Sequence, residues 1–232
     1  MDIKLISFDA ADTLIKLALS IGDHYSSCAI KYEVVVNPQD VNKTFKKVFA
    51  NTPPLGTDGK KGFEWWAKVI ELTFSDLGFH RSRFSDFDRF AFELYSALAE
   101  DRAWILFNDV LPTLKKLKAK DYRMIVFSNF DERLIKILKD LQIFNYFERV
   151  VCSTEIGYAK PDKESFLRVS ELVDLNPSEI LHVGDGVKND YLGALNADLK
   201  AVLLDRNDLF GESETIKSSE RILSLEELKE RL

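Results

Sequence analysis

The amino-acid sequence predicts an α/β fold, a parallel sheet with helices on both faces, interrupted after its first strand by an all-helical insertion. Two observations lead to this prediction. Short apolar runs that are typical of buried strands alternate with amphipathic segments, which is the pattern of βαβ units. Residues 16–100 show helical spacing and no convincing strand. We therefore expect residues 1–15 and 101–232 to form the sheet domain and residues 16–100 to form an inserted domain.

The expected strands are apolar over most of their length, as strands are when helices cover both faces of a parallel sheet. The first ends at a carboxylate, Asp9, and the second runs into Ser128 and Asn129. Ligands gather outside the carboxyl ends of such strands, so these polar residues are expected at the mouth of a site. Five strands are expected, at residues 3–9, 122–127, 149–152, 180–184 and 200–204.

The insertion is expected to be a bundle of helices. Pro38 follows Asn37, and proline is well suited to the first turn of a helix. The segment contains two of the three tryptophans and many phenylalanines, which we interpret as a packed bundle core rather than a cofactor site. A loop rich in proline and glycine is expected at residues 51–59. The expected helices occupy residues 17–32, 38–49, 63–77 and 86–99.

The sheet domain is expected to carry its own helices between the strands. Residues 104–108 lead back to it, and residues 110–120 form an amphipathic helix. The last helix is expected to begin at Ser224, because Glu227 follows at the spacing of a capping box. Two further helices are expected at residues 134–141 and 164–173.

Composition excludes several classes of protein. The 232 residues carry a net charge of −6 with both signs mixed, which disfavours a nucleic-acid or anionic membrane surface. No run approaches the roughly 18 apolar residues of a membrane span, and the amino terminus does not resemble a signal peptide. Cys28 and Cys152 lie far apart without metal-ligand spacing, so we expect a reducing, cytoplasmic compartment.

Polar residues at the ends of the expected strands form one constellation, since a parallel sheet brings them to one rim. Ser128 and Asn129 offer a hydroxyl and an amide, which suit anionic oxygens. Lys160 lies between Ala159 and Pro161, and a residue before proline is held extended, which favours a fixed point charge. The glycine-rich turn after the fourth strand carries two carboxylates, Asp185 and Asp190, which suit Mg²⁺.

These residue types fit phosphoryl transfer to a carboxylate. A carboxylate that attacks phosphorus approaches an anion, so positive charge must lie close by. Mg²⁺ and Lys160 would supply it and stabilise the transferring oxygens. The metal would also let Asp9 and Asp185 approach each other without strong repulsion. The product would be an aspartyl-phosphate on Asp9, which water later hydrolyses.

The constellation resembles that of the haloacid dehalogenase superfamily of hydrolases, and the resemblance covers nearly the whole chain. It implies a Rossmann-like core and a mobile, helical C1-type cap. Within the superfamily, the first motif is most similar to the group around haloacid dehalogenase-like hydrolase domain-containing protein 3. Four motifs in order carry the resemblance: Asp9-x-x-x-Thr13, Ser128-Asn129, Lys160-Pro161-Asp162, and Gly184-Asp185 with Asn189-Asp190.

The resemblance also implies a role for each site residue. Asp9 would be the nucleophile, and Thr13 would support the loop that carries it. Mg²⁺ would be the cofactor, and a small phosphorylated molecule would be the substrate. The metal would be held by Asp9, Asp185 and the backbone carbonyl of Ala11, with Asp190 alongside, directly or through water. The phosphoryl group would be bound by Ser128, Asn129 and Lys160.

One position departs from the superfamily pattern. Phosphatases of the superfamily usually carry a second aspartate two residues after the nucleophile, which protonates the leaving group and then activates water. Here that residue is Ala11, and the next residue, usually glycine, is Asp12. General acid–base help is worth roughly 10²–10⁴-fold in rate, so its loss should slow the departure of poor leaving groups. Asp12 substitutes for it only if the turn is reshaped.

Three functions remain open at this stage, with a monomer or a homodimer equally compatible. The first is a slow or narrow Mg²⁺-dependent phosphohydrolase. The second is hydrolysis of a different bond, as in the dehalogenases and phosphonatases of the superfamily. Dehalogenases need no Mg²⁺, so the retained carboxylates Asp185 and Asp190 argue against that activity. Phosphonatases add a cap lysine. The third is a binding or regulatory protein, which Ala11 favours. The candidate cap lysines are Lys31, Lys43, Lys46, Lys47, Lys60, Lys61 and Lys68.

Overall fold

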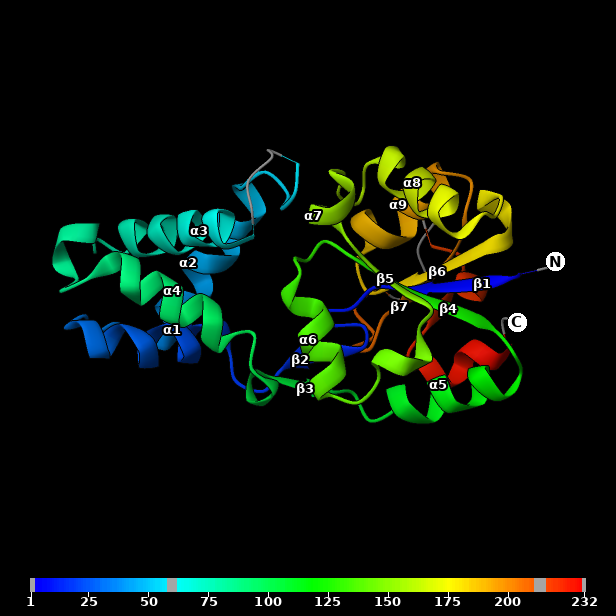
Figure 1. The fold of residues 1–232 in the computed structure, drawn as a ribbon, viewed down its shortest axis with the longest axis horizontal. Coiled ribbons are helices and arrows are strands. Elements are labelled where there is room, and N and C mark those ends of the chain that lie inside the picture. Colours follow the sequence, from blue (N-terminus) through cyan, green and yellow to red (C-terminus); the bar gives the residue numbers. More distant parts are fainter. Residues whose placement is uncertain (1–2, 58–61, 211–215, 231–232) are drawn as a thin grey trace.

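The computed structural model describes residues 3–57, 62–210 and 216–230, and its centre is a parallel sheet (Figure 1). Within these residues, six strands pair in the order β5-β4-β1-β6-β7-β8, every neighbour parallel. This confirms the predicted α/β sheet and adds one short edge strand, β8. The strands are β1 (Leu5–Phe8), β4 (Arg123–Ser128), β5 (Arg149–Cys152), β6 (Ile180–Gly184), β7 (Lys200–Leu204) and β8 (Arg221–Ile222).

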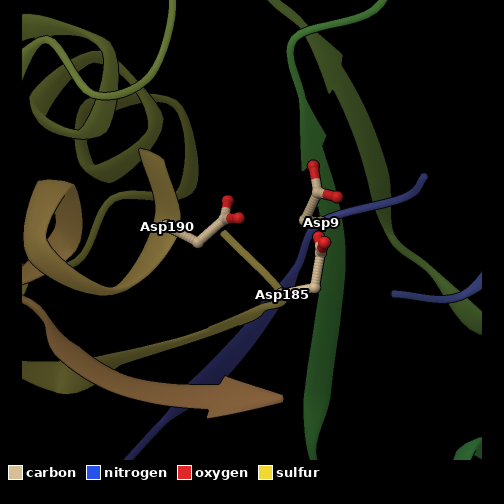
Figure 2. A group of neighbouring side chains, drawn as sticks. All are labelled: Asp9, Asp185 and Asp190. Carbon is tan, nitrogen blue, oxygen red and sulfur yellow. The ribbon is translucent and has the colours of Figure 1, made fainter. Parts of the chain in front are cut away.

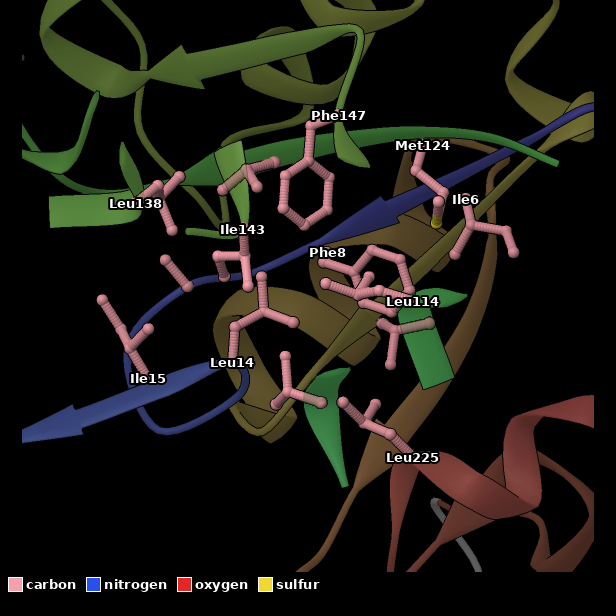
Figure 3. Packing of buried hydrophobic residues seen from close by; sticks show 14 of the residues in the cluster. Ile6, Phe8, Leu14, Ile15, Leu114, Met124, Leu138, Ile143, Phe147 and Leu225 are labelled. Carbon is pink, nitrogen blue, oxygen red and sulfur yellow. The ribbon is translucent and has the colours of Figure 1, made fainter. Parts of the chain in front are cut away.

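Helices cover both faces of the sheet, because successive strand residues point to opposite sides. On β1, Ile6 and Phe8 face one apolar cluster and Leu5 faces the other. Figure 3 shows the first cluster around Phe8, where Leu114 and Phe147 pack against the sheet. The first face carries α5 (Val110–Ala119) and α6 (Arg133–Asp140), and the second carries α8 (Lys163–Val173) and α9 (Gly193–Asn196).

The inserted segment forms a helical bundle beside the sheet (Figure 1). Its aromatic residues do build a packed core: the rings of Phe74 and Phe84 meet edge to face at 5.1 Å, and those of Phe74 and Phe90 at 5.2 Å. Pro38 opens the second helix, as expected, with the Asn37 side chain as its cap. The bundle helices are α1 (Ile21–Ala29), α2 (Pro38–Asn51), α3 (Gly62–Asp76) and α4 (Phe87–Ala97).

A second, two-stranded sheet joins the bundle to the core, and the sequence prediction was wrong there. We expected a helix from residue 17 and only a connection at 104–108, but β2 (Ile15–Leu17) pairs antiparallel with β3 (Trp104–Leu106). Each strand has three residues, too few to show an alternating pattern. Their pairing depends on the chain entering and leaving the bundle at the same place, which no local pattern reveals.

Local capping explains the remaining differences in element boundaries. The first bundle helix begins at Ile21 because the Ser20 hydroxyl accepts the Asp23 amide N–H at 3.2 Å. The last helix is a 3₁₀ helix over Leu225–Glu230, and the Glu227 carboxylate accepts the Ser224 amide N–H at 3.0 Å. A short helix, α7 (Ser153–Ile156), was not expected.

Within the described part of the chain, no helix is both long and apolar enough to span a membrane.

Candidate active site

The carboxyl ends of the sheet strands bring the predicted polar residues together around one cavity. Asp9 follows β1, Ser128 ends β4, and Asp185 follows β6. Lys160 reaches them from the segment between α7 and α8. All four line a cavity of about 400 Å³. The geometric expectation that strand ends would gather these side chains is therefore met.

Lys160 lies at the centre of the site and is 2% exposed. Its Nζ donates to Asp9 Oδ1 at 2.6 Å, to Asp190 Oδ1 at 2.5 Å and to the Phe127 carbonyl at 3.1 Å. An ammonium group has three N–H donors, so these contacts fix its position completely. The ammonium group is therefore held between the two carboxylates.

Ser128 and Asn129 approach the site from the end of β4 but do different things. The Ser128 hydroxyl donates to Asp9 Oδ1 at 3.0 Å. The Asn129 amide instead pairs with the backbone of Lys160, donating from Nδ2 to its carbonyl and accepting its N–H at Oδ1, both at 2.8 Å. Asn129 thus positions Lys160, a contact that the sequence did not suggest.

Thr13 joins the loop after β1 to the loop after β6. It is fully buried, and its Oγ1 accepts the Asp185 amide N–H at 3.1 Å. Its carbonyl accepts a hydrogen bond from Arg206 at 2.8 Å. These contacts fix the loop that follows Asp9, which is the supporting position expected for Thr13.

Three carboxylates form an oxygen-rich group at the floor of the cavity. Figure 2 shows Asp9, Asp185 and Asp190 on neighbouring segments with their carboxylates gathered together. One oxygen from each lies within 4.8 Å of the others. Oxygen ligands at this spacing suit a hard cation such as Mg²⁺, and Ala11 lines the same cavity. The residues predicted to hold a metal are therefore neighbours.

The site carries an excess of negative charge. Burial, with Asp9 and Asp190 nearby, raises the pKa of Asp185 to about 7. Burial also raises the pKa of Asp9, against the opposing charge of Lys160. Burial acts in the same direction on Asp190, but Lys160 and His182 hold its pKa well below the ordinary value. A bound cation would favour the ionised form of these carboxylates.

A wide helical turn and a histidine hold Asp190 in place. The turn spans Val187–Leu192, and the Gly186 N–H donates to Asp190 Oδ2 at 2.9 Å. His182 is fully buried, with Nε2 3.1 Å from Asp190 Oδ1 and Nδ1 3.0 Å from Ser7 Oγ. Burial lowers the pKa of His182, so the neutral ring donates to the carboxylate from Nε2. His182 is thus a hydrogen-bonded core residue that also orients Asp190.

Position 11 presents only a methyl group to the cavity. Ala11 lines it together with Asp12, whose backbone is left-handed with φ of 59°. The Asp12 N–H donates to the Ile15 carbonyl at 2.7 Å, so the turn bends towards β2. Burial raises the pKa of Asp12, opposed by Lys16. A glycine accommodates such a backbone more easily, which accounts for glycine being usual at this position.

The cavity wall opposite the carboxylates is apolar and comes mainly from the bundle and the two-stranded sheet. The sequence favoured a packed core for the bundle aromatics but also allowed a pocket lining or a dimer surface, and some of them line this cavity. Of the candidate cap lysines that the structure describes, none lines the cavity, and Lys60 and Lys61 lie outside the described residues. The apolar wall consists of Leu17, Ile21, Phe45, Phe49, Trp66, Leu98, Trp104 and Phe130.

A buried ion pair adjoins this wall. The Arg133 guanidinium donates from Nε to Asp131 Oδ1 and from Nη2 to Asp131 Oδ2, both at 2.8 Å. Its Nη1 donates to the Tyr95 carbonyl on the bundle at 3.0 Å. Asp131 also accepts the Trp66 indole N–H at 3.0 Å. The clue in the sequence is position, since Asp131 and Arg133 lie two and four residues after Asn129.

Comparison with known proteins places this geometry in a family. A family model described as haloacid dehalogenase-like hydrolase matches residues 3–198. Among curated proteins, haloacid dehalogenase-like hydrolase domain-containing protein 3 of Danio rerio is 29% identical over 235 residues, covering 99% of this chain and 96% of that protein. The relative therefore extends over the bundle as well as the sheet.

Solved structures share the fold at low sequence identity. The chain resembles L-2-haloacid dehalogenase of Xanthobacter autotrophicus with a TM-score of 0.76 and 16% identity, covering 98% of this chain and 97% of that one. The HAD-hydrolase YfnB of Bacillus subtilis, bound to magnesium, gives 0.75 and 17%, covering 99% and 98%. A HAD phosphatase of Thermococcus onnurineus gives 0.67 and 20%, covering 98% and 96%.

Proposed function

The chain belongs to the haloacid dehalogenase-like hydrolases, and from that premise we propose that it is a Mg²⁺-dependent phosphohydrolase of a small phosphorylated metabolite. The observation that supports this most directly is the fixed charge of Lys160 between Asp9 and Asp190, beside three clustered carboxylate oxygens. A fixed cation and a metal site next to a carboxylate nucleophile are what transfer of an anionic phosphoryl group requires. The helical bundle would act as the cap domain over this site.

The chain's own residues suggest how the reaction runs. Asp9 Oδ1 is occupied by Ser128 and Lys160, which leaves Oδ2 to attack phosphorus. The new bond joins Asp9 Oδ2 to phosphorus, and the bond from phosphorus to the leaving oxygen breaks. Lys160 and Ser128 would release Asp9 Oδ1 and donate to the phosphoryl oxygens instead. Asn129 would hold the backbone of Lys160 in place. Water then cleaves the aspartyl-phosphate and releases inorganic phosphate.

The carboxylate group fits the proposed metal by its donor chemistry. Asp9, Asp185 and Asp190 offer only oxygen ligands, and their mutual repulsion is relieved by a divalent cation. Bound there, Mg²⁺ would offset the charge of the phosphoryl oxygens. That the similar Bacillus subtilis hydrolase was solved with magnesium supports this choice of ion.

A second candidate function is a binding or regulatory protein that keeps the anion site without useful turnover. Ala11 favours it, because the methyl group can neither protonate a leaving group nor activate water. Dehalogenase-like cleavage of a carbon–halogen bond has support only from a fold shared with dehalogenases such as the Xanthobacter protein. The paired carboxylates Asp185 and Asp190 argue against it here.

The proposal is tested by Mg²⁺-dependent hydrolysis of p-nitrophenyl phosphate, whose leaving group asks little of the missing acid. We expect turnover by the wild type that EDTA abolishes and that Asp9→Asn lacks. Asp88→Asn, at an exposed aspartate of the bundle, is the matched control and should retain the wild-type rate. Ala11→Asp should raise the rate, by less than the roughly 10²–10⁴-fold of full acid–base help.

Two outcomes would contradict the proposal in different ways. Turnover that survives in Asp9→Asn would show that another residue is the nucleophile. Turnover by Ala11→Asp alone would show an assembled site without its acid–base group, and the regulatory function would then be the better description.

A further inference from the structure

We propose that the substrate class is an aryl phosphate, in which a planar aromatic ring without any further charged group carries the phosphoryl group through a phenolic oxygen. This inference rests on the proposed phosphohydrolase function and adds the identity of the leaving group. Three independent features of the cavity point to it: its aromatic wall, its balance of charge, and the methyl group at position 11.

The aromatic wall is shaped to receive a flat ring. The rings of Phe45 and Trp66 are parallel within 1°, with centroids 6.4 Å apart, and Phe49 lies 6.0 Å from Trp66. Phe49 is 45% exposed, in contrast with the buried aromatic residues of the bundle core. Phe45 and Trp66 pack against the bundle core and also line the cavity, and stacking on aromatic faces favours a planar aromatic group.

The sheet domain fixes the orientation of this wall. The Trp66 indole N–H donates to Asp131 Oδ2 at 3.0 Å, and the Arg133 guanidinium lies 5.3 Å from the Trp66 ring centre. Because Asp131 belongs to the loop that follows Asn129, the wall and the phosphate-binding residues are held by the same segment. A preorganised wall loses less entropy on binding than a mobile one.

Among the described residues that line this cavity, no cation is left unpaired for a second anionic group. Arg133 and Lys160 are the cationic residues that line it within the described chain. Arg133 is paired bidentately with Asp131 and also bound to the Tyr95 carbonyl, so its charge is neutralised. Lys160 is committed to the phosphate end. Along the apolar wall, a carboxylate or second phosphate on the substrate body would meet aromatic and aliphatic side chains, at a cost in desolvation.

Position 11 restricts the leaving group. Asp9 Oδ2 forms the new bond to phosphorus, and the electron pair of the broken P–O bond stays on the leaving oxygen. Ala11 cannot supply a proton to it, so the oxygen departs as an anion and takes its proton from water afterwards. A phenolate has a conjugate acid of pKa about 10, as for tyrosine, whereas alkoxides resemble hydroxide, with a conjugate acid near pKa 15.7. Aryl esters are therefore favoured over alkyl esters.

The test compares kcat/KM for four compounds with Mg²⁺ present: phenyl phosphate, p-nitrophenyl phosphate, benzyl phosphate and acetyl phosphate. Benzyl phosphate keeps the ring but leaves as an alkoxide, and acetyl phosphate has a good leaving group without a ring. We expect both aryl phosphates to exceed acetyl phosphate, although acetate is the better leaving group, and to exceed benzyl phosphate. The ratio kcat/KM reports the departure step even where hydrolysis of the aspartyl-phosphate limits kcat.

Two variants locate the preference on the aromatic wall. Trp66→Leu and Phe49→Leu should each lower the ratio of aryl to acetyl phosphate kcat/KM by about tenfold, the size of one aromatic contact. A phenylalanine ring has no N–H to donate, so Phe49→Leu keeps the Trp66–Asp131 hydrogen bond and separates stacking from it. Phe92→Leu removes an exposed phenylalanine that does not line the cavity, and it should leave the ratio unchanged.

The outcomes separate this inference from the function on which it rests. If every compound stays at the level of the Asp9→Asn blank, the phosphohydrolase proposal fails and this inference fails with it. If acetyl phosphate is hydrolysed as well as the aryl phosphates, or both wall variants keep the wild-type ratio, the aryl class is wrong while the function stands.

Discussion

At the scale of single residues, Lys160 is the group on which the site depends most. Replacement by methionine would leave the carboxylates of Asp9 and Asp190 without their cation. Both residues are almost completely buried from solvent. Removing one partner of a buried ion pair costs about 3–5 kcal/mol. We expect Lys160→Met to lose that much unfolding free energy in urea at pH 7 with EDTA present.

Lys163→Met is the matched control for this loss. Lys163 lies three residues later in the sequence with a half-exposed side chain, 3.6 Å from Asp198, so its removal should cost less than about 1 kcal/mol. Mg²⁺ should stabilise Lys160→Met more than the wild type, because the carboxylates have lost their competing cation. Equal losses in the two variants would show that Lys160 is not a buried structural charge.

Single residues also show which features of the site could be predicted from the sequence. Asp9, Lys160 and Asp185 could be predicted because each ends or follows an apolar run, and strand ends meet at one rim. The pairing of Asn129 with the Lys160 backbone could not be predicted, since it depends on the path of a loop 31 residues later. The hydrogen bond between His182 and Asp190 likewise depends on a wide helical turn that no periodic pattern indicates.

At the scale of elements, Asp109 connects three segments at the start of α5. Its Oδ2 accepts from Arg206 Nη1 at 2.8 Å, the Ser224 hydroxyl at 3.0 Å and the Leu225 N–H at 2.8 Å. Arg206 in turn holds the Thr13 carbonyl. The carboxylate therefore caps the last helix and, through Arg206, supports the loop after β1 at the same time.

The pH dependence of stability should reveal this role of Asp109. Burial alone would raise its pKa, but the hydrogen bonds from Arg206, Leu225 and Ser224 hold the pKa below its ordinary value of 3.8. A carboxyl group with a lowered pKa in the folded state stabilises above its unfolded pKa and loses that contribution as the pH falls. Asp109→Asn should thus cost about 1.5–3 kcal/mol at pH 7, the size of a charged hydrogen bond.

The measurement is urea unfolding of Asp109→Asn and wild type between pH 7 and pH 3. The difference in unfolding free energy should be constant down to about pH 4 and shrink as the pH falls through the lowered pKa of Asp109. Asp88→Asn, at an exposed position, controls for the general effect of losing a carboxylate. A difference that stays constant to pH 3 would show that charge at Asp109 does not matter.

Elements also divide into those that local patterns reveal and those that they do not. The strands around Asp9 and His182 were predictable because continuous apolar runs bounded by polar turns have few other interpretations. The pairing of Ile15–Leu17 with Trp104–Leu106 was not, because three-residue strands gain their stability from a partner far along the chain. The β2–β3 sheet carries Leu17 and Trp104 into the cavity wall, so missing it also hid part of the site.

At the scale of the whole molecule, the bundle rests on the sheet domain through the loop after β4. Arg133 reaches the Tyr95 carbonyl, and its guanidinium lies 3.7 Å from the Tyr95 ring centre. The Trp66 indole N–H binds Asp131, and the Ser153 hydroxyl donates to the Leu55 carbonyl at 2.7 Å. The cavity lies between the two parts, so access to Asp9 depends on how firmly these contacts hold.

Loss of the Arg133 contacts should let the bundle and the sheet domain separate. We expect Arg133→Met to have a larger radius of gyration than the wild type in small-angle X-ray scattering, because its bond to Tyr95 and its contact with the Trp66 ring are both removed. Unless an interface is large and apolar, relative motion of two such parts is the default. Circular dichroism at the same temperature checks that the helices remain folded.

Arg168→Met controls for the change in net charge, since Arg168 is exposed on α8 and pairs with Glu171 within the same helix. Its scattering profile should match the wild type. Beryllium fluoride with Mg²⁺, as a mimic of the phosphorylated aspartate, should bring the profile of Arg133→Met back towards that of the wild type by adding contacts at the closed site. If Arg133→Met and wild type scatter identically without it, the contacts of the loop after β4 do not control closure, and the bundle is held by its other contacts.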